Sequence, residues 1–98
     1  MNEYMITIKF ISHASREFAS LIPAQRVKMK DLIEKGVITG HCLSIDRKYL
    51  WITLYADSKK GVLEILGSLP LFSFMWYDIN ELMFHDNPVH TTMKLSLN

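Results

Sequence analysis

The stretch Leu69-Pro70-Leu71-Phe72-Ser73-Phe74-Met75 marks the point at which the chain changes from a helix to its last strand. Proline lacks a backbone N–H and disfavours the helical conformation in the residue before it, so the preceding segment, residues 58–68, must end at Pro70. That segment has apolar side chains at helical spacing. Large apolar side chains follow Pro70 closely, and they predict a strand from about Phe74 to Phe84.

The earlier part of the chain has the periodicities of three strands and one helix. The predicted elements are a strand at Tyr4–Ile11, a helix from a polar turn at residues 12–15 to about Lys35, and strands at Thr39–Ile45 and Tyr49–Ala56. Pro23 lies within the predicted helix, where it should either bend the helix or mark its true first turn. Gly36 suits the end of that helix. The short turn at residues 46–48 makes the two strands around it a hairpin.

This order of elements is β-α-β-β-α-β, the ferredoxin-like split βαβ plan of the α+β class. We expect an antiparallel four-stranded sheet with both helices on one face. A chain of 98 residues can form one hydrophobic core but not two, so residues 1–98 are interpreted as a single domain. Residues 86–98 are interpreted as a C-terminal tail, whose end at Thr91–Leu97 could form an extra strand.

The third strand indicates what covers each face of the sheet. Its even-numbered positions are aliphatic and suit a core beneath the helices: Leu50, Ile52 and Leu54. Its odd-numbered positions are Tyr49, Trp51, Thr53 and Tyr55. This second face is too aromatic for a freely solvated surface, so we expect another copy of the chain to cover it and form a homodimer.

Composition excludes several classes of function. The net charge of +1 comes without a basic block, which argues against a surface that binds nucleic acid through phosphates. RNA-recognition domains share this element order, but their glycine-and-aromatic motif is absent. We expect neither a signal peptide nor a membrane segment, because the first residues lack a basic start with an apolar core and no apolar run is long enough to span a bilayer. The single cysteine, Cys42, excludes an intrachain disulfide, and we expect a cytoplasmic protein.

Gln25 is the polar residue that stands out on the first helix. The apolar stripe of this helix comprises Phe18, Leu21, Ile22, Met29, Leu32 and Ile33. At about 100° per residue, Gln25 falls near the middle of the stripe and Arg26 near its edge. Gln25 is either a buried amide bonded to backbone or water, or part of a ligand pocket. Arg26 either holds a carboxylate or lactone carbonyl, or pairs with an acidic neighbour.

Three further groups of residues have competing interpretations. His41 and Cys42 are adjacent in a strand and point to opposite faces, so only His41 is a candidate base. Asp46 and Arg47 either form a salt bridge that shapes the hairpin turn or belong to a site, and the preference of turns for aspartate favours the salt bridge. The histidines lack the spacing of a metal site, so we expect neither a metal nor a cofactor. These histidines are His13, His41, His85 and His90.

Leu69-Pro70-Leu71-Phe72 resembles the segment before the last strand of muconolactone delta-isomerases, small bacterial enzymes that move a proton within an unsaturated lactone. The resemblance covers most of the chain and implies a dimeric α+β barrel that assembles into larger rings. It places Gln25 where the family has its acid/base glutamate, and an amide cannot transfer protons in that way. The segments Ile22-Pro23-Ala24-Gln25-Arg26, Asp46-Arg47 and Leu50-Trp51 look like a divergent bacterial branch of that family.

Two hypotheses of function follow from the residues and the resemblance. The first is a small-molecule site in each dimer barrel, with a proton-shift isomerisation of a small lactone or unsaturated acid. Its substrate-binding residues would be Gln25, Arg26, Tyr49 and Trp51, and its catalytic residues would be His41 and His85, which would replace the missing carboxylate. The second is a non-catalytic module for ligand binding or oligomerisation, which has lost the acid/base group.

Overall fold

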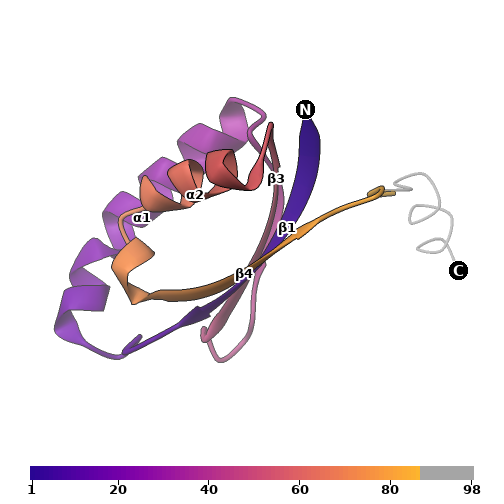
Figure 1. Ribbon diagram of the computed structural model, residues 1–98. Coiled ribbons are helices and arrows are strands. Elements are labelled where there is room, and N and C mark those ends of the chain that lie inside the picture. Colours follow the sequence, from indigo (N-terminus) through magenta and orange to yellow (C-terminus); the bar gives the residue numbers. More distant parts are fainter. Residues whose placement is uncertain (87–98) are drawn as a thin grey trace, which may run out of the picture.

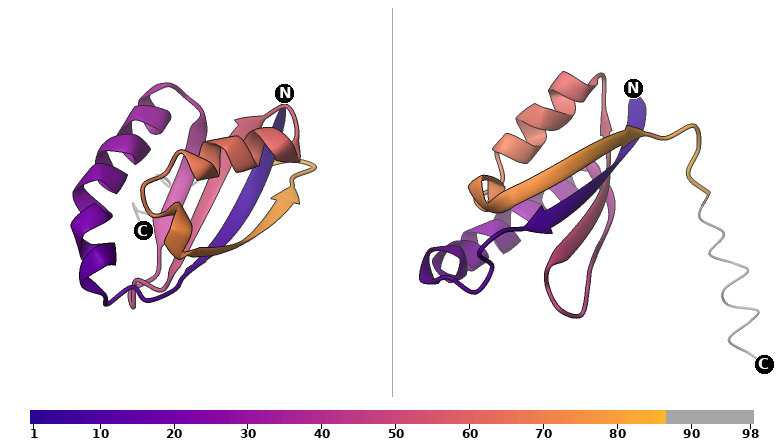
Figure 2. Two further views of the ribbon diagram at one scale, coloured as in Figure 1. Left: turned by 60° about the vertical axis from the view of Figure 1, so that its left-hand side comes forward. Right: turned by 60° about the horizontal axis from the view of Figure 1, so that its bottom comes forward.

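The computed structural model describes residues 1–86 and contains every predicted helix and strand in the predicted order (Figure 1). The elements are β1 (Asn2–Phe10), α1 (Arg16–Glu34), β2 (Ile38–Leu43), β3 (Tyr49–Ala56), α2 (Lys59–Gly67), the 3-10 helix η1 (Phe72–Phe74) and β4 (Met75–Glu81). The strands form one antiparallel sheet in the order β2-β3-β1-β4. Both helices lie on the same face of the sheet (Figures 1 and 2). The predicted ferredoxin-like α+β fold is therefore confirmed.

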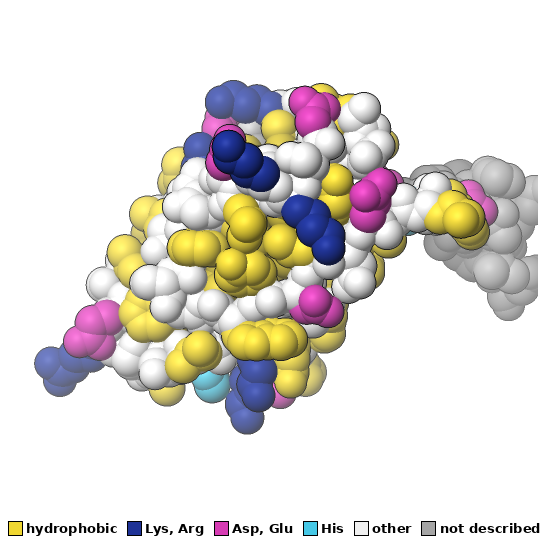
Figure 3. All heavy atoms as spheres, in the orientation of Figure 1, with side chains coloured by type: hydrophobic (Ala, Val, Ile, Leu, Met, Phe, Trp, Pro, Cys, Tyr) yellow, Lys and Arg dark blue, Asp and Glu magenta, His cyan; other side chains and the backbone are white. Residues whose placement is uncertain are grey.

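The core lies between the helices and the sheet. Side chains alternate in burial along β1 and β3, as expected for strands with one face against helices. The most buried residues of the core include Tyr4, Ile6, Ile8, Ile52, Leu54, Val62 and Leu66. Figure 3 shows further hydrophobic side chains where α2 borders β4, with charged side chains around them. The half-buried residues Ile65, Phe72, Tyr77 and Ile79 pack against the core there.

Local hydrogen bonds set the limits of α1. The Ser15 hydroxyl accepts a hydrogen bond from the Phe18 N–H at 3.2 Å, so the helix begins at Arg16. Pro23 therefore lies in the helix interior and not in its first turn. It is exposed, so the carbonyl one turn earlier can bond to water in place of the missing N–H. Gly36 ends the helix region with a φ of +74°, a conformation that favours glycine.

The bounds of β2 and β4 differ from the prediction. β2 stops at Leu43 because Ser44 opens the hairpin turn, where its carbonyl accepts a hydrogen bond from the Arg47 N–H at 2.9 Å. β4 begins at Met75 because η1 occupies the three residues before it. β4 ends at Glu81, after which one further bond joins the Leu82 N–H to the Glu3 carbonyl at 2.9 Å.

The predicted C-terminal tail lies almost wholly outside the described residues. This holds for the possible strand at Thr91–Leu97 and for His90. The tail and the single-domain assignment of residues 1–98 therefore stay predictions. No helix within residues 1–86 is long and apolar enough to cross a bilayer.

Candidate functional site

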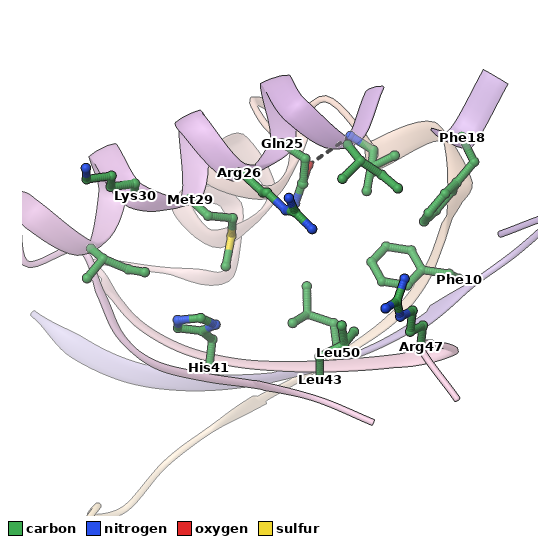
Figure 4. A pocket seen from close by; sticks show the side chains of 13 residues that line it. Phe10, Phe18, Gln25, Arg26, Met29, Lys30, His41, Leu43, Arg47 and Leu50 are labelled. Carbon is green, nitrogen blue, oxygen red and sulfur yellow. Dashed lines mark hydrogen bonds between the residues drawn. The ribbon is translucent and has the colours of Figure 1, made fainter. Parts of the chain in front are cut away.

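A cavity of about 510 Å³ lies between α1 and the face of the sheet that the helices cover (Figure 4). This volume is within the range of about 300 to 1,000 Å³ that is typical of small-molecule sites. The apolar lining comprises Phe10, Phe18, Ile22, Met29, Ile33, Leu43, Leu50 and Leu71. The polar lining comprises Gln25, Arg26, Lys30, His41 and Arg47. The cavity thus combines an apolar floor with a few nitrogen-bearing side chains.

Gln25 is a buried residue of α1 whose side-chain oxygen has a hydrogen-bond partner and whose side-chain nitrogen has none among the described residues. Its side chain is only 6% exposed, and its Oε1 accepts a hydrogen bond from the Leu71 N–H at 3.0 Å. Because that backbone group can only donate, the amide oxygen must face it, and Nε2 faces away. Nε2 is buried and has no hydrogen-bond partner among the described residues. Gln25 therefore anchors the segment after Pro70, lines the cavity and keeps a buried donor without a partner among the described residues.

Arg26 and Arg47 bring positive charge to the cavity from opposite walls. Figure 4 shows Arg26 pointing from α1, and Arg47 from the hairpin turn, into the space between helix and sheet. Lys30 is turned away in that view, and its Nζ lies 3.9 Å from the Glu34 carboxylate. The ion pairs within residues 1–86 involve neither arginine, and no acidic residue lines the cavity. The charge of the site is therefore cationic.

The hairpin turn holds Arg47 in a conformation that side chains rarely adopt, with a φ of +64°. The Asp46 carboxylate accepts hydrogen bonds from the Ser44 hydroxyl at 2.6 Å and from the Lys48 N–H at 2.9 Å. The Ser44 bond and then the Lys48 bond hold the pKa of Asp46 below its usual value. The expected salt bridge between Asp46 and Arg47 is therefore wrong: local donors occupy the carboxylate, and Arg47 points to the cavity.

A β-bulge directs His41 to the cavity. The pairing of β2 with β3 shifts between Ile38 and Gly40, so His41 lies opposite Ile52 and faces the helices. Cys42 lies opposite Trp51 on the other face, as expected for adjacent strand residues. A Cβ atom on Gly40 would lie 3.0 Å from the Thr53 Oγ1, so any side chain at this position of the bulge would crowd the Thr53 hydroxyl. His41 is thus the side chain of the cavity best suited to proton exchange near neutral pH.

Tyr49 and Trp51 do not line the cavity. They stack on each other with ring centroids 5.7 Å apart, on the face of the sheet opposite to the helices. Strand alternation separates them from Leu50, which lines the cavity and is the residue between them. The six predicted site residues therefore do not all line this cavity, which lies on the helix side of the sheet.

His85 also lies apart from His41. Its Nδ1 is 3.1 Å from a Glu3 carboxylate oxygen, which also accepts a hydrogen bond from the Thr39 hydroxyl at 2.6 Å. Burial alone would raise the pKa of Glu3, but the bonds from Thr39 and His85 outweigh burial and lower it. The structure thus brings Gln25, Arg26 and His41 together and leaves out His85. Within residues 1–86, no three side chains of the metal-binding types are grouped to hold a metal ion.

Comparison with solved structures finds a likeness in fold. A crystal structure of muconolactone isomerase superposes on this chain with a TM-score of 0.69, covering 90% of this chain and 95% of the other. The chain has the fold of muconolactone isomerase. Sequence identity is only 14%, so the likeness concerns the fold alone. No protein-family model and no curated protein sequence matches the chain.

Sequence reasoning did not select Arg47 or the bulge as parts of a site. Arg47 was interpreted as a turn residue, and its direction depends on a left-handed backbone conformation that spacing does not reveal. A glycine inside a predicted strand is a recognised sign of a bulge, and Gly40 was the available signal. That signal, taken with the pairing of the hairpin, places His41 on the helix side.

Proposed function

We propose that this chain is a muconolactone isomerase-like small-molecule-binding protein whose ligand is a small lactone or unsaturated acid. The observation that carries this proposal is Gln25, a residue that lines the cavity and whose buried Nε2 has no partner among the described residues. Leaving such a donor unsatisfied costs about 1–3 kcal/mol. A ligand carbonyl bound beside it would recover much of that free energy.

The cavity also offers the groups that a proton-shift isomerisation needs. His41 would take a proton from the carbon next to a conjugated carbonyl and return it to another carbon of the same molecule. The Gln25 amide would donate a hydrogen bond to the carbonyl oxygen, where negative charge develops. Arg26 would hold a carboxylate of the substrate. In this proposal, His41 performs the role that the family gives to the glutamate.

The alternative is a binding protein without catalytic activity. Its support is the amide at residue 25 together with the absence of a carboxylate among the described residues that line the cavity. The two alternatives share the ligand class and differ in turnover. His41 is the residue that separates them, because it is the imidazole among the described lining residues and imidazoles serve as general bases.

We further propose a homodimer in which two sheets pack face to face as a dimeric α+β barrel. The support is the outer face of the sheet, where Met5, Tyr55 and Trp76 are 38%, 42% and 54% exposed, beside the stacked Tyr49 and Trp51. A surface of this kind is typical of an interface. Assembly into larger rings and the location in the cytoplasm remain proposals from the sequence.

The test follows the Gln25 side-chain amide by NMR while muconolactone or an unsubstituted butenolide is added. We expect a shift of this resonance, which the Gln25→Glu variant identifies by its absence. Turnover of muconolactone that is lost in His41→Gln would support the isomerase, and binding without turnover would support the alternative. Gln25→Glu should gain or increase turnover, because it restores a carboxylate. No shift with either compound would overturn the proposal.

A further inference from the structure

The cavity has more volume than a simple butenolide needs. Its volume of about 510 Å³ is of the size that encloses drug-sized molecules. The side chains of its floor are almost fully buried, with Phe10, Phe18, Met29 and Leu50 each less than 10% exposed. Phe10 and Phe18 meet edge to face with ring centroids 5.1 Å apart, which gives the floor a rigid aromatic part.

The cationic groups of the cavity lie at its exposed rim. Arg26 and Arg47 are both exposed, and Figure 4 shows them pointing toward the cavity from the helix and from the turn. Guanidinium groups bind carboxylates through paired hydrogen bonds. Gln25 of α1 also lines the cavity, and its buried Nε2 has no partner among the described residues. The lining therefore combines exposed cationic groups with buried apolar side chains.

Resting on the proposed function, we propose that the ligand is an amphipathic carboxylate whose apolar body is bulkier than a simple lactone ring, as in an aryl- or alkyl-substituted acid. Its carboxylate lies between Arg26 and Arg47, and its apolar body lies against Phe10, Phe18 and Met29. The opposite orientation is excluded because an ionised carboxylate on the apolar floor would lose its hydration without a partner.

Arg47 is the residue that determines this specificity. Arginine adopts the left-handed backbone conformation less readily than asparagine or glycine, yet the turn holds it there through the bonds to Asp46. Strained backbone conformations of this kind gather at functional sites, where the side chain is needed in one direction. Here the strain directs a guanidinium toward the cavity and opposite Arg26.

Titration calorimetry with benzoate, cinnamate and naphthoate, each beside its neutral amide, tests the proposal. We expect affinity to rise with the size of the apolar body, and each acid to bind about tenfold more tightly than its amide, since a charge-assisted bond supplies that difference. Arg47→Asn should remove this preference, because asparagine tolerates the backbone conformation but lacks the charge. Arg26→Gln should weaken it in the same way.

Arg16→Gln is the matched control, because Arg16 is an exposed arginine of α1 that does not line the cavity. Equal binding of acids and amides, or equal losses in Arg47→Asn and Arg16→Gln, would overturn the inference. Butenolide binding without binding of the larger acids would overturn it and leave the proposed function intact. If no acid or lactone of any size shifts the Gln25 amide resonance, the proposed function fails as well.

Discussion

The two faces of the sheet differ in how their polar side chains find partners. On the outer face, Glu3, Thr39 and His85 satisfy one another, and the Thr53 hydroxyl lies 2.8 Å from that of Thr39. On the helix face, Gln25 keeps an unpaired buried donor, and neither arginine at the cavity takes part in an ion pair of residues 1–86. Polar groups that are already paired suit a surface that another protein covers. Unpaired groups around a cavity suit a ligand.

The largest effect should come from a charge placed on the outer face. Tyr55→Lys puts a cation on the proposed interface, and we expect it to weaken dimerisation by about 2–4 kcal/mol, as for the loss of an interface anchor. Val27→Lys is the control, because Val27 is 72% exposed on α1. Sedimentation velocity over a range of concentrations measures both. A wild-type protein that sediments as a monomer at every concentration would overturn the proposed homodimer.

The next largest effect should follow from a change at the bulge. Gly40→Ala places a Cβ atom 3.0 Å from the Thr53 Oγ1, and we expect this crowding to lower the free energy of unfolding by about 1–3 kcal/mol. The same change should disturb the direction of His41 and weaken binding in the cavity.

Gly67→Ala is the matched control for this change, since nothing lies within 4 Å of a Cβ atom at that position in α2. Alanine there should leave stability unchanged or raise it, because alanine favours the helix. Urea unfolding of the two variants compares them directly. Equal stability of both variants would show that the bulge does not need glycine.

A smaller effect is expected from the loss of the Gln25 amide. Gln25→Leu leaves the buried Leu71 N–H without a partner but also removes the unpaired Nε2, so we expect the free energy of unfolding to fall by only about 1 kcal/mol. Hydrogen exchange of the Leu71 amide should become faster in this variant. Unchanged exchange would mean that Gln25 does not hold the segment that leads to β4.

The smallest effect concerns Glu3, whose pKa is lower in the folded protein than its usual value of 4.5. The folded protein therefore binds this proton less readily than the unfolded chain does. The stabilisation by the Glu3 carboxylate is present above the usual value and is lost as pH falls through the lowered pKa. We expect Glu3→Gln to destabilise the protein by less than about 1 kcal/mol at neutral pH, as for most exposed pairs.

Urea unfolding at neutral and at acidic pH measures this contribution. The difference between wild type and Glu3→Gln should disappear at acidic pH, where the carboxyl group is protonated. A difference that persists there would assign the effect to the shape of the glutamine side chain and not to the charge of Glu3.

The fold could be predicted from the sequence because its signals are local. Alternation along β1 and β3, the proline after α2 and the stripe of α1 each depend on neighbouring residues. The same signals placed Gln25 and Arg26 on the face that turned out to line the cavity. These local signals did not predict the direction of a side chain where that direction depends on an unusual backbone conformation or on a contact with a residue far away in the sequence. The direction of Arg47 is of the first kind, and the contact of His85 with Glu3, 82 residues away, is of the second.

The hydrogen bond that the Leu71 N–H donates to Gln25 connects the cavity on the helix face with the strand that carries Trp76 on the outer face. Leu71 stands just before η1, which leads into β4, and the first two residues of that strand point to opposite faces: Met75 is buried in the core and Trp76 is 54% exposed on the outside. A ligand bound to the Gln25 amide would therefore lie one hydrogen bond away from the segment that leads to Trp76. The Trp76 indole is a fluorophore at the end of that segment, so we expect its fluorescence emission to change when a ligand fills the cavity.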